Sequence, residues 1–60
     1  MIKNGQKVRI CRGDDFEEGI VKYVHPTNRW FSIEHGTDEY KWRTSFKFDE
    51  IGKTIKLVKG

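Results

Sequence analysis

The sequence predicts an all-β chain that folds as a five-stranded antiparallel barrel with one short 3₁₀ turn before the last strand. Apolar residues alternate with polar ones in short runs, which is the period of a strand with one buried face. Gly, Pro, Asn and Asp gather between these runs, as they do at tight turns. Five short strands joined by tight turns leave two open edges unless they close into a barrel, so we expect closure.

Length and composition limit the organisation of the chain. Its 60 residues make one domain, residues 1–60, for which we expect a net stability of about 3–5 kcal/mol. Charged residues are as frequent as hydrophobic ones, but two Trp, two Tyr and four Phe argue against disorder. One cysteine excludes a disulfide within the chain, and no apolar run has membrane-spanning length. We therefore expect a cytoplasmic protein without a membrane partner.

The first two strands are predicted from alternation and from the break between them. Residues 6–12 form the first strand, because Val8 and Ile10 alternate with polar and basic positions. Residues 13–15, Gly-Asp-Asp, interrupt the pattern as a turn. Residues 18–25 form the second strand.

The third and fourth strands are separated by two turn signals. Pro, Thr and Asn at 26–28 predict a turn, since Pro presets its backbone angle and Asn tolerates the left-handed region. Residues 30–34 form the third strand, and 35–38 the next turn. Residues 40–46, rich in aromatic and β-branched side chains, form the fourth strand.

The end of the chain supplies the last turn and strand. Residues 48–51 are too few for an α-helix and fit one 3₁₀ turn, which Gly52 ends. Residues 54–58 form the fifth strand. The positions predicted to form the core are Val8, Ile10, Val21, Val24, Phe31, Ile33, Phe46, Ile51, Ile55 and Leu57.

Several short stretches resemble a known group of small barrels. Gly-Gln-Lys-Val-Arg-Ile at 5–10, Gly-Ile-Val at 19–21 and the turn at 48–51 are similar to the SH3-like small-barrel group. This group includes the KOW motif, Tudor and chromo-barrel domains and small phage-encoded barrels. Arg-Thr-Ser-Phe at 43–46, followed by Asp-Glu-Ile at 49–51, looks most like the phage or prophage barrels. The resemblance implies the fold, while the fold itself hosts many unrelated functions.

Basic and aromatic residues occur at alternate, outward positions of the predicted strands. Cations bind phosphates and exposed rings stack on bases, so this pattern favours a nucleic-acid partner. In the alternative interpretation the aromatic residues belong to the core and the cations form a solvated face that protects the sheet edges. The candidate nucleic-acid-binding residues are Lys7, Arg9, Lys22, Arg29, Trp30, Lys41, Trp42 and Arg43.

An acidic segment suggests a second function. We predict that Asp14, Asp15, Phe16, Glu17 and Glu18 form a loop between the first two strands. If Phe16 is exposed, the loop could anchor a protein partner; if Phe16 packs beneath the loop, it covers the barrel. The second candidate is therefore a protein-binding adaptor or inhibitor that docks on a larger host protein through this loop.

The sequence does not favour catalysis or metal binding. Cys11, His25 and His35 lack the paired spacing of zinc ligands. Ser32 and Ser45 lie within predicted strands, and no Gly-rich phosphate loop is present. We expect neither a cofactor, a metal nor a small-molecule substrate, and we do not expect an enzyme. An exposed strand edge leaves the oligomeric state open.

Overall fold

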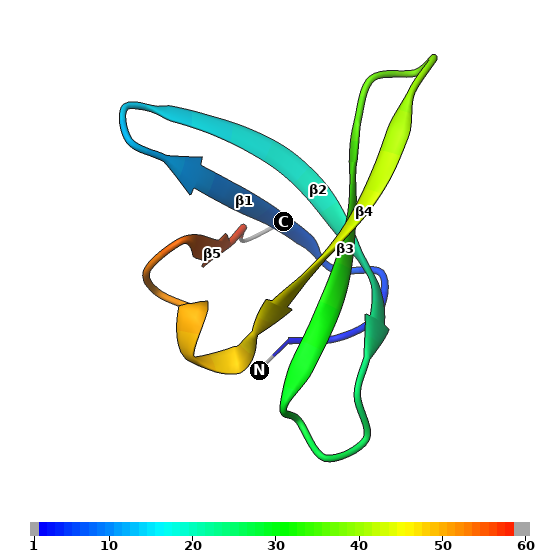
Figure 1. Cartoon of the computed structure of the whole chain (residues 1–60), viewed down its shortest axis with the longest axis vertical. Helices are drawn as coiled ribbons and strands as arrows, with labels where there is room; N and C mark the ends of the chain where they lie inside the picture. Colours follow the sequence, from blue (N-terminus) through cyan, green and yellow to red (C-terminus); the bar gives the residue numbers. More distant parts are fainter. Residues whose placement is uncertain (1, 59–60) are drawn as a thin grey trace.

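A computed structural model describes residues 2–58 of the chain, and within them all strands belong to one antiparallel sheet (Figure 1). The sheet has the strand order β4-β3-β2-β1-β5, so β4 and β5 are its edges. The prediction of an all-β chain with five strands and a 3₁₀ turn before the last strand is confirmed. The elements are β1 (Lys7–Arg12), β2 (Asp15–Val24), β3 (Trp30–Gly36), β4 (Lys41–Lys47), the 3₁₀ turn η1 (Phe48–Glu50) and β5 (Ile55–Leu57).

The strand β2 is the longest and takes part in both halves of the sheet. It pairs with β1 from Asp15 to Ile20 and with β3 from Gly19 to Val24. Its register shifts between Val21 and Tyr23, and such a bulge bends a strand. In Figure 1 the curved β2 leads into the β3–β4 hairpin, which crosses the β1–β2 hairpin. The inner face of the bent sheet encloses the core, and the outer face is turned to solvent.

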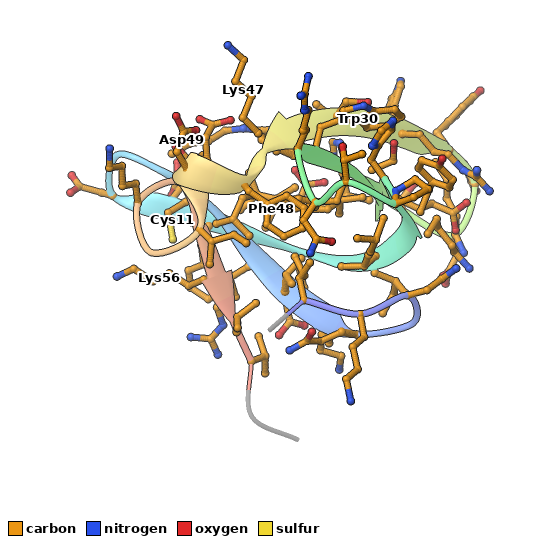
Figure 2. All side chains as sticks on the ribbon, turned by 90° about the horizontal axis from the view of Figure 1, so that it is seen from below. Cys11, Trp30, Lys47, Phe48, Asp49 and Lys56 are labelled. Atoms are coloured by element: carbon orange, nitrogen blue, oxygen red, sulfur yellow. The ribbon has the colours of Figure 1, made fainter. Side chains whose placement is uncertain are left out.

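The core consists of apolar side chains from every strand except β4, together with residues that pack against them. Phe31 is fully buried and meets the edge of the Phe48 ring at 5.4 Å. Figure 2 shows Phe48 directed into the middle of the molecule. The buried residues are Ile2, Val8, Ile10, Val21, Phe31, Ile33 and Ile55, and Val24, Phe46, Phe48 and Ile51 pack against them. Nine of the ten positions predicted from alternation are among these residues.

The prediction of the core is wrong at Leu57, which is 38% exposed. Leu57 pairs with Val8 at the last position of a short edge strand, where the sheet does not cover it on its second side. Ile2 is buried instead. The backbone N–H of Gly5 donates to the carbonyl of Val21, which ties the segment after Ile2 to β2.

The predicted acidic loop is also wrong, because Asp15 to Glu18 belong to β2. The turn is reduced to Gly13 and Asp14, and Arg12 pairs directly with Asp15. Gly13 has a φ of 61°, a left-handed conformation that glycine adopts without strain and that two-residue hairpin turns need. With so short a turn, the acidic residues continue the ladder and alternate between the two faces of the sheet.

Substitution of three phenylalanines that differ in burial tests which residues form the core. Phe31→Ala removes a fully buried ring and is expected to lower the free energy of unfolding by about 3–5 kcal/mol, enough to unfold most of the protein. Phe46→Ala should cost less, because Phe46 is half-buried at an edge strand. Phe16→Ala is the control, since that ring is 58% exposed. Urea denaturation followed by circular dichroism measures all three, and a near-native transition for Phe31→Ala would contradict the core described here.

Candidate nucleic-acid interface

The basic residues of the strands lie on the outer face of the sheet. Lys7 and Arg9 are exposed and alternate with the buried Val8 and Ile10 on β1. On β3 the side chains of Ile33 and His35 turn to the inner face, so Glu34 between them points outward. Arg43 of β4 pairs with Glu34 and therefore lies on the outer face as well. Lys22, Lys41 and Lys56 share the outer side, from β2, β4 and β5. Cations from four strands therefore share the outer side of the sheet, on which β4 and β5 are the opposite edges.

Two carboxylates lie among these cations. The Arg9 Nε atom is 4.0 Å from Glu18 Oε2, across the β1–β2 pair. Glu34 lies 4.0 Å from Lys22 Nζ and 3.8 Å from Arg43 Nε. These ion pairs are solvent-exposed and long, so each contributes little to stability. We call Lys7, Arg9, Lys22, Lys41, Arg43 and Lys56, with the interspersed Glu18 and Glu34, the basic face.

Aromatic rings border the basic face at two places. Trp30 lies on β3 with its ring 5.2 Å from Tyr23 and 5.4 Å from His25. Phe16 is exposed on β2, and the Arg9 guanidinium lies 4.7 Å from the centre of its ring, a cation–π contact. Phe16 is therefore neither part of a loop nor packed over the core.

Trp42 is not on the basic face, although it alternates with Lys41 and Arg43. It pairs with His35, and the two rings lie 6.3 Å apart on the inner side of the β3–β4 hairpin. There the hairpin extends beyond the core, so Trp42 remains 56% exposed. Of the eight candidate residues, Arg29 follows the β2–β3 turn, Trp42 lies on the inner side, and the other six lie on outward positions.

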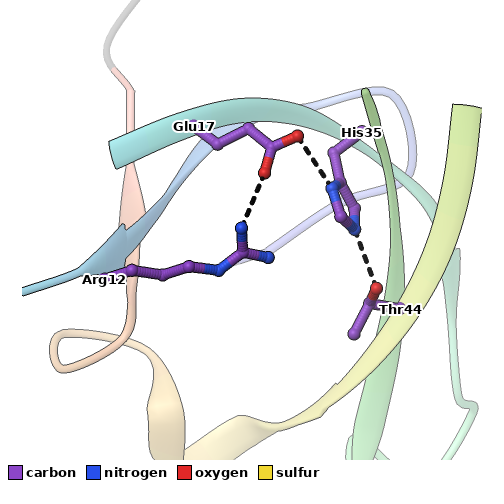
Figure 3. A network of polar contacts seen from close by, with 4 residues as sticks. All are labelled: Arg12, Glu17, His35 and Thr44. Carbon is purple, nitrogen blue, oxygen red and sulfur yellow. Dashed lines mark hydrogen bonds and ion pairs between the residues drawn. The ribbon is translucent and has the colours of Figure 1, made fainter. Parts of the chain in front are cut away.

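The inner side of the hairpins holds a polar network that the sequence did not reveal (Figure 3). His35 Nδ1 lies 2.9 Å from Glu17 Oε2, and its Nε2 lies 2.7 Å from the Thr44 hydroxyl. Arg12 donates to Glu17 Oε1 at 3.1 Å. The carboxylate can only accept, so Nδ1 carries a hydrogen and donates to Glu17. The Thr44 hydroxyl can donate to Nε2 of a neutral imidazole or accept from Nε2 of a protonated one. The hydrogen bonds of the network are therefore possible in both protonation states of His35.

This network joins β1, β2, β3 and β4 at the open end of the core. Its order of carboxylate, imidazole and hydroxyl also occurs in nucleophilic triads. Thr44, however, lines neither of two grooves on the surface, although His35 lines the smaller one, so neither groove places a substrate beside the hydroxyl. The Ser32 and Ser45 hydroxyls bond to each other on the outer face, at 3.2 Å. We interpret the His35 network as structural.

The pKa of Glu17 lies below its ordinary value of 4.5. The main cause is the hydrogen bond from His35, which stabilises the ionised carboxylate, and the charges of His35 and Arg12 act in the same direction. Partial burial opposes them by disfavouring the charge.

Two grooves are cut into the surface near the candidate residues. One has a volume of about 900 Å³ and is lined by Arg29, Trp30, Lys47, Asp49, Glu50 and Lys53, among others; we call it the Trp30 groove. The second, of about 200 Å³, joins Lys7 of β1 to Lys41 of β4 and is also lined by Glu18, Glu34 and Asp38. The second groove therefore contains more carboxylates than cations.

Comparison with known proteins gives no match to a family model, to a curated protein or to a solved structure. Within residues 2–58, no helix has both the length and the apolar character that crossing a bilayer requires. In the same residues, Cys11, His25 and His35 are not gathered with other potential ligands into a group that could hold a metal ion.

The His35 network predicts a pH dependence of stability. The unfolded chain protonates Glu17 at a higher pH than the folded protein, so its contribution is complete above pH 4.5 and is lost as the pH falls through the lower folded pKa. Glu17→Gln should therefore lower the free energy of unfolding by about 1 kcal/mol at neutral pH. The difference from the wild type should shrink at acid pH, below 4.5, as the carboxylate of the folded protein takes up its proton.

Urea denaturation at both pH values measures this difference. Glu18→Gln is the matched control, because it removes the same charge one residue away on the outer face. An equal effect of Glu17→Gln at both pH values would show that the hydrogen bond to His35 does not lower the pKa of this carboxylate.

Proposed function

We propose that this chain is an SH3-like small barrel that acts as a binding module, not as an enzyme, and that its basic face binds nucleic acid. The strand order and the 3₁₀ turn before β5 agree with the resemblance to small barrels. Closure of the barrel is supported by the last part of the chain. It leads from the edge strand β4 through η1 and a parallel bridge between Ile51 and Ile55 to β5, which pairs with β1.

The observation that supports nucleic-acid binding best is the gathering of six cations on one face. Strands β1, β2, β4 and β5 contribute them; Glu18 and Glu34 lie among them, and Asp38 lines the groove between Lys7 and Lys41. Such an excess of positive charge attracts a phosphate backbone, and phosphate contacts need no particular base sequence. The aromatic rings of Trp30 and Tyr23 at the border of the face offer surfaces for base stacking.

A protein partner is the second candidate, and the exposed Phe16 favours it. The carboxylates of the acidic segment lie on two faces of the sheet: Glu17 accepts a hydrogen bond from His35, and Glu18 forms an ion pair with Arg9. Phe16, Asp14 and Asp15 remain exposed at the end of the β1–β2 hairpin. A basic protein surface with an apolar contact would complement this hairpin end.

Nucleic-acid binding predicts a steep dependence on salt. With three or four phosphates neutralised, affinity for a DNA duplex should fall about 40- to 150-fold between about 50 and 200 mM salt. Arg9→Ala combined with Arg43→Ala should weaken binding to all sequences alike and reduce the slope of log affinity against log salt by about 2. Fluorescence anisotropy with labelled oligonucleotides measures both effects.

Carboxylate variants provide a test with the opposite sign. Glu18→Gln with Glu34→Gln removes the anions from the basic face and should tighten binding severalfold, since charges 4 Å apart in water interact by about 1 kcal/mol. Asp14→Asn with Asp15→Asn makes the same change in net charge at the hairpin end and serves as the control. If both pairs change affinity equally, only net charge matters and the basic face is not the site. If no oligonucleotide binds at about 50 mM salt, nucleic-acid binding is refuted.

A further inference from the structure

We infer that the Trp30 groove binds one unpaired nucleotide of a single strand, with the base stacked on Trp30 and the phosphates held by Lys47, Arg29 and Lys53. This inference rests on the proposed nucleic-acid function and names the form of nucleic acid and the place where it is recognised. It follows from the shape of the groove, the support of the Trp30 ring and the charges around it.

The groove has the size and the composition for such a ligand. Its volume of about 900 Å³ falls within the range of small-molecule sites, which bind ligands of nucleotide size. One wall carries an indole ring, and three cations face two carboxylates, Asp49 and Glu50. The Lys7–Lys41 groove has two cations against three carboxylates and no Trp or Tyr ring, so it suits a phosphate less well.

The Trp30 ring is held in position before any ligand arrives. Tyr23 and His25 lie against it at 5.2 and 5.4 Å. Its carbonyl accepts a hydrogen bond from the His25 N–H at 3.0 Å, which closes the β2–β3 turn. A platform that is already ordered loses little conformational entropy on binding, so more of the stacking free energy appears as affinity.

The cations that line the groove come from three segments of the chain: Arg29 before β3, Lys47 at the end of β4 and Lys53 after η1. Lys47 pairs directly with Trp30 across β3 and β4, and Figure 2 shows Lys47 and Asp49 on the same side of the molecule as Trp30. Arg29 precedes Trp30, and its carbonyl accepts a hydrogen bond from the Phe48 N–H at 3.3 Å. That bond ties the β2–β3 turn to η1, so the two walls of the groove are fixed relative to each other.

A single strand fits this arrangement better than a duplex does. Bases in a duplex are stacked on their neighbours, and no flat surface is free for an indole ring. In a single strand a base can leave the stack and lie on an aromatic side chain, while its phosphates contact nearby cations. The basic face adjoins Trp30 along β3 and β4, so the rest of the strand can follow it.

Trp30 itself reports on binding. In a Trp42→Phe variant it is the sole tryptophan, and its fluorescence should be quenched by a single strand of about eight nucleotides but not by a duplex of equal length. Trp30→Leu should weaken single-strand binding about 5- to 150-fold and leave duplex binding unchanged. Trp30→Tyr keeps an aromatic platform and should retain most of the affinity. Trp42→Leu is the matched control and should change neither affinity.

The outcomes separate this inference from the proposed function. If single strands bind in a salt-dependent way but neither quench Trp30 nor respond to Trp30→Leu, the groove is not the site, although the basic face still is. If a mononucleotide binds as tightly as the oligonucleotide, the ligand is a free nucleotide and the inference is overturned. If neither single strands nor duplexes bind, both proposals fail. Amide spectra of each variant establish that it is folded, and the quenching of Trp30 does not depend on Trp30→Leu being folded.

Discussion

The bend of β2 is the constraint on which the rest of the structure depends. At Gly19 a Cβ atom would clash with Ile33 Cγ2 and lie 3.0 Å from the Glu34 carbonyl oxygen, so β3 approaches too closely for any side chain there. Two residues later the bulge at Val21–Tyr23 turns the strand. Because β2 pairs with β1 before this region and with β3 after it, the bend folds one sheet around its own core. The same bend spreads the outward cations over a convex surface.

Strand alternation also determines where the negative charge lies, and this decides the electrostatics of the outer face. Glu17 and Glu18 are adjacent in sequence, yet one supports His35 on the inner side and the other lies beside Arg9 on the outer side. A single loop containing all four carboxylates of the segment would concentrate negative charge at one end of the sheet. Its incorporation into β2 divides that charge between the two faces, and the basic face keeps an excess of cations.

Alternation predicted the fold and most of the core, because a half-buried strand must place apolar residues at every second position. Val8, Ile10, Phe31 and Ile33 follow that rule, whereas Leu57 obeys the same pattern on an edge strand and remains 38% exposed. The Gly-Asp pair at 13–14 is a two-residue hairpin signal, and the turn predicted there is present. The extension of that turn into an acidic loop is wrong, because Asp and Glu are common in loops but here continue the strand. The contacts of His35 and the bracing of Trp30 join residues distant in sequence, so no local pattern could reveal them.

The outward cations have two physical explanations, and their positions distinguish them. Charged side chains on an edge strand prevent pairing with another sheet. This explains Lys41, Arg43 and Lys47, since β4 is an edge. It does not explain Lys7, Arg9 and Lys22, because β1 and β2 are paired on both sides and have no edge to protect. On these interior strands the second explanation is charge pairing across the sheet, because Arg9 lies 4.0 Å from Glu18 Oε2 and Lys22 Nζ lies 4.0 Å from Glu34. Lys7 lies opposite Ile20 and is explained by neither edge protection nor charge pairing, so it is the interior cation for which the proposed contact with phosphate matters most.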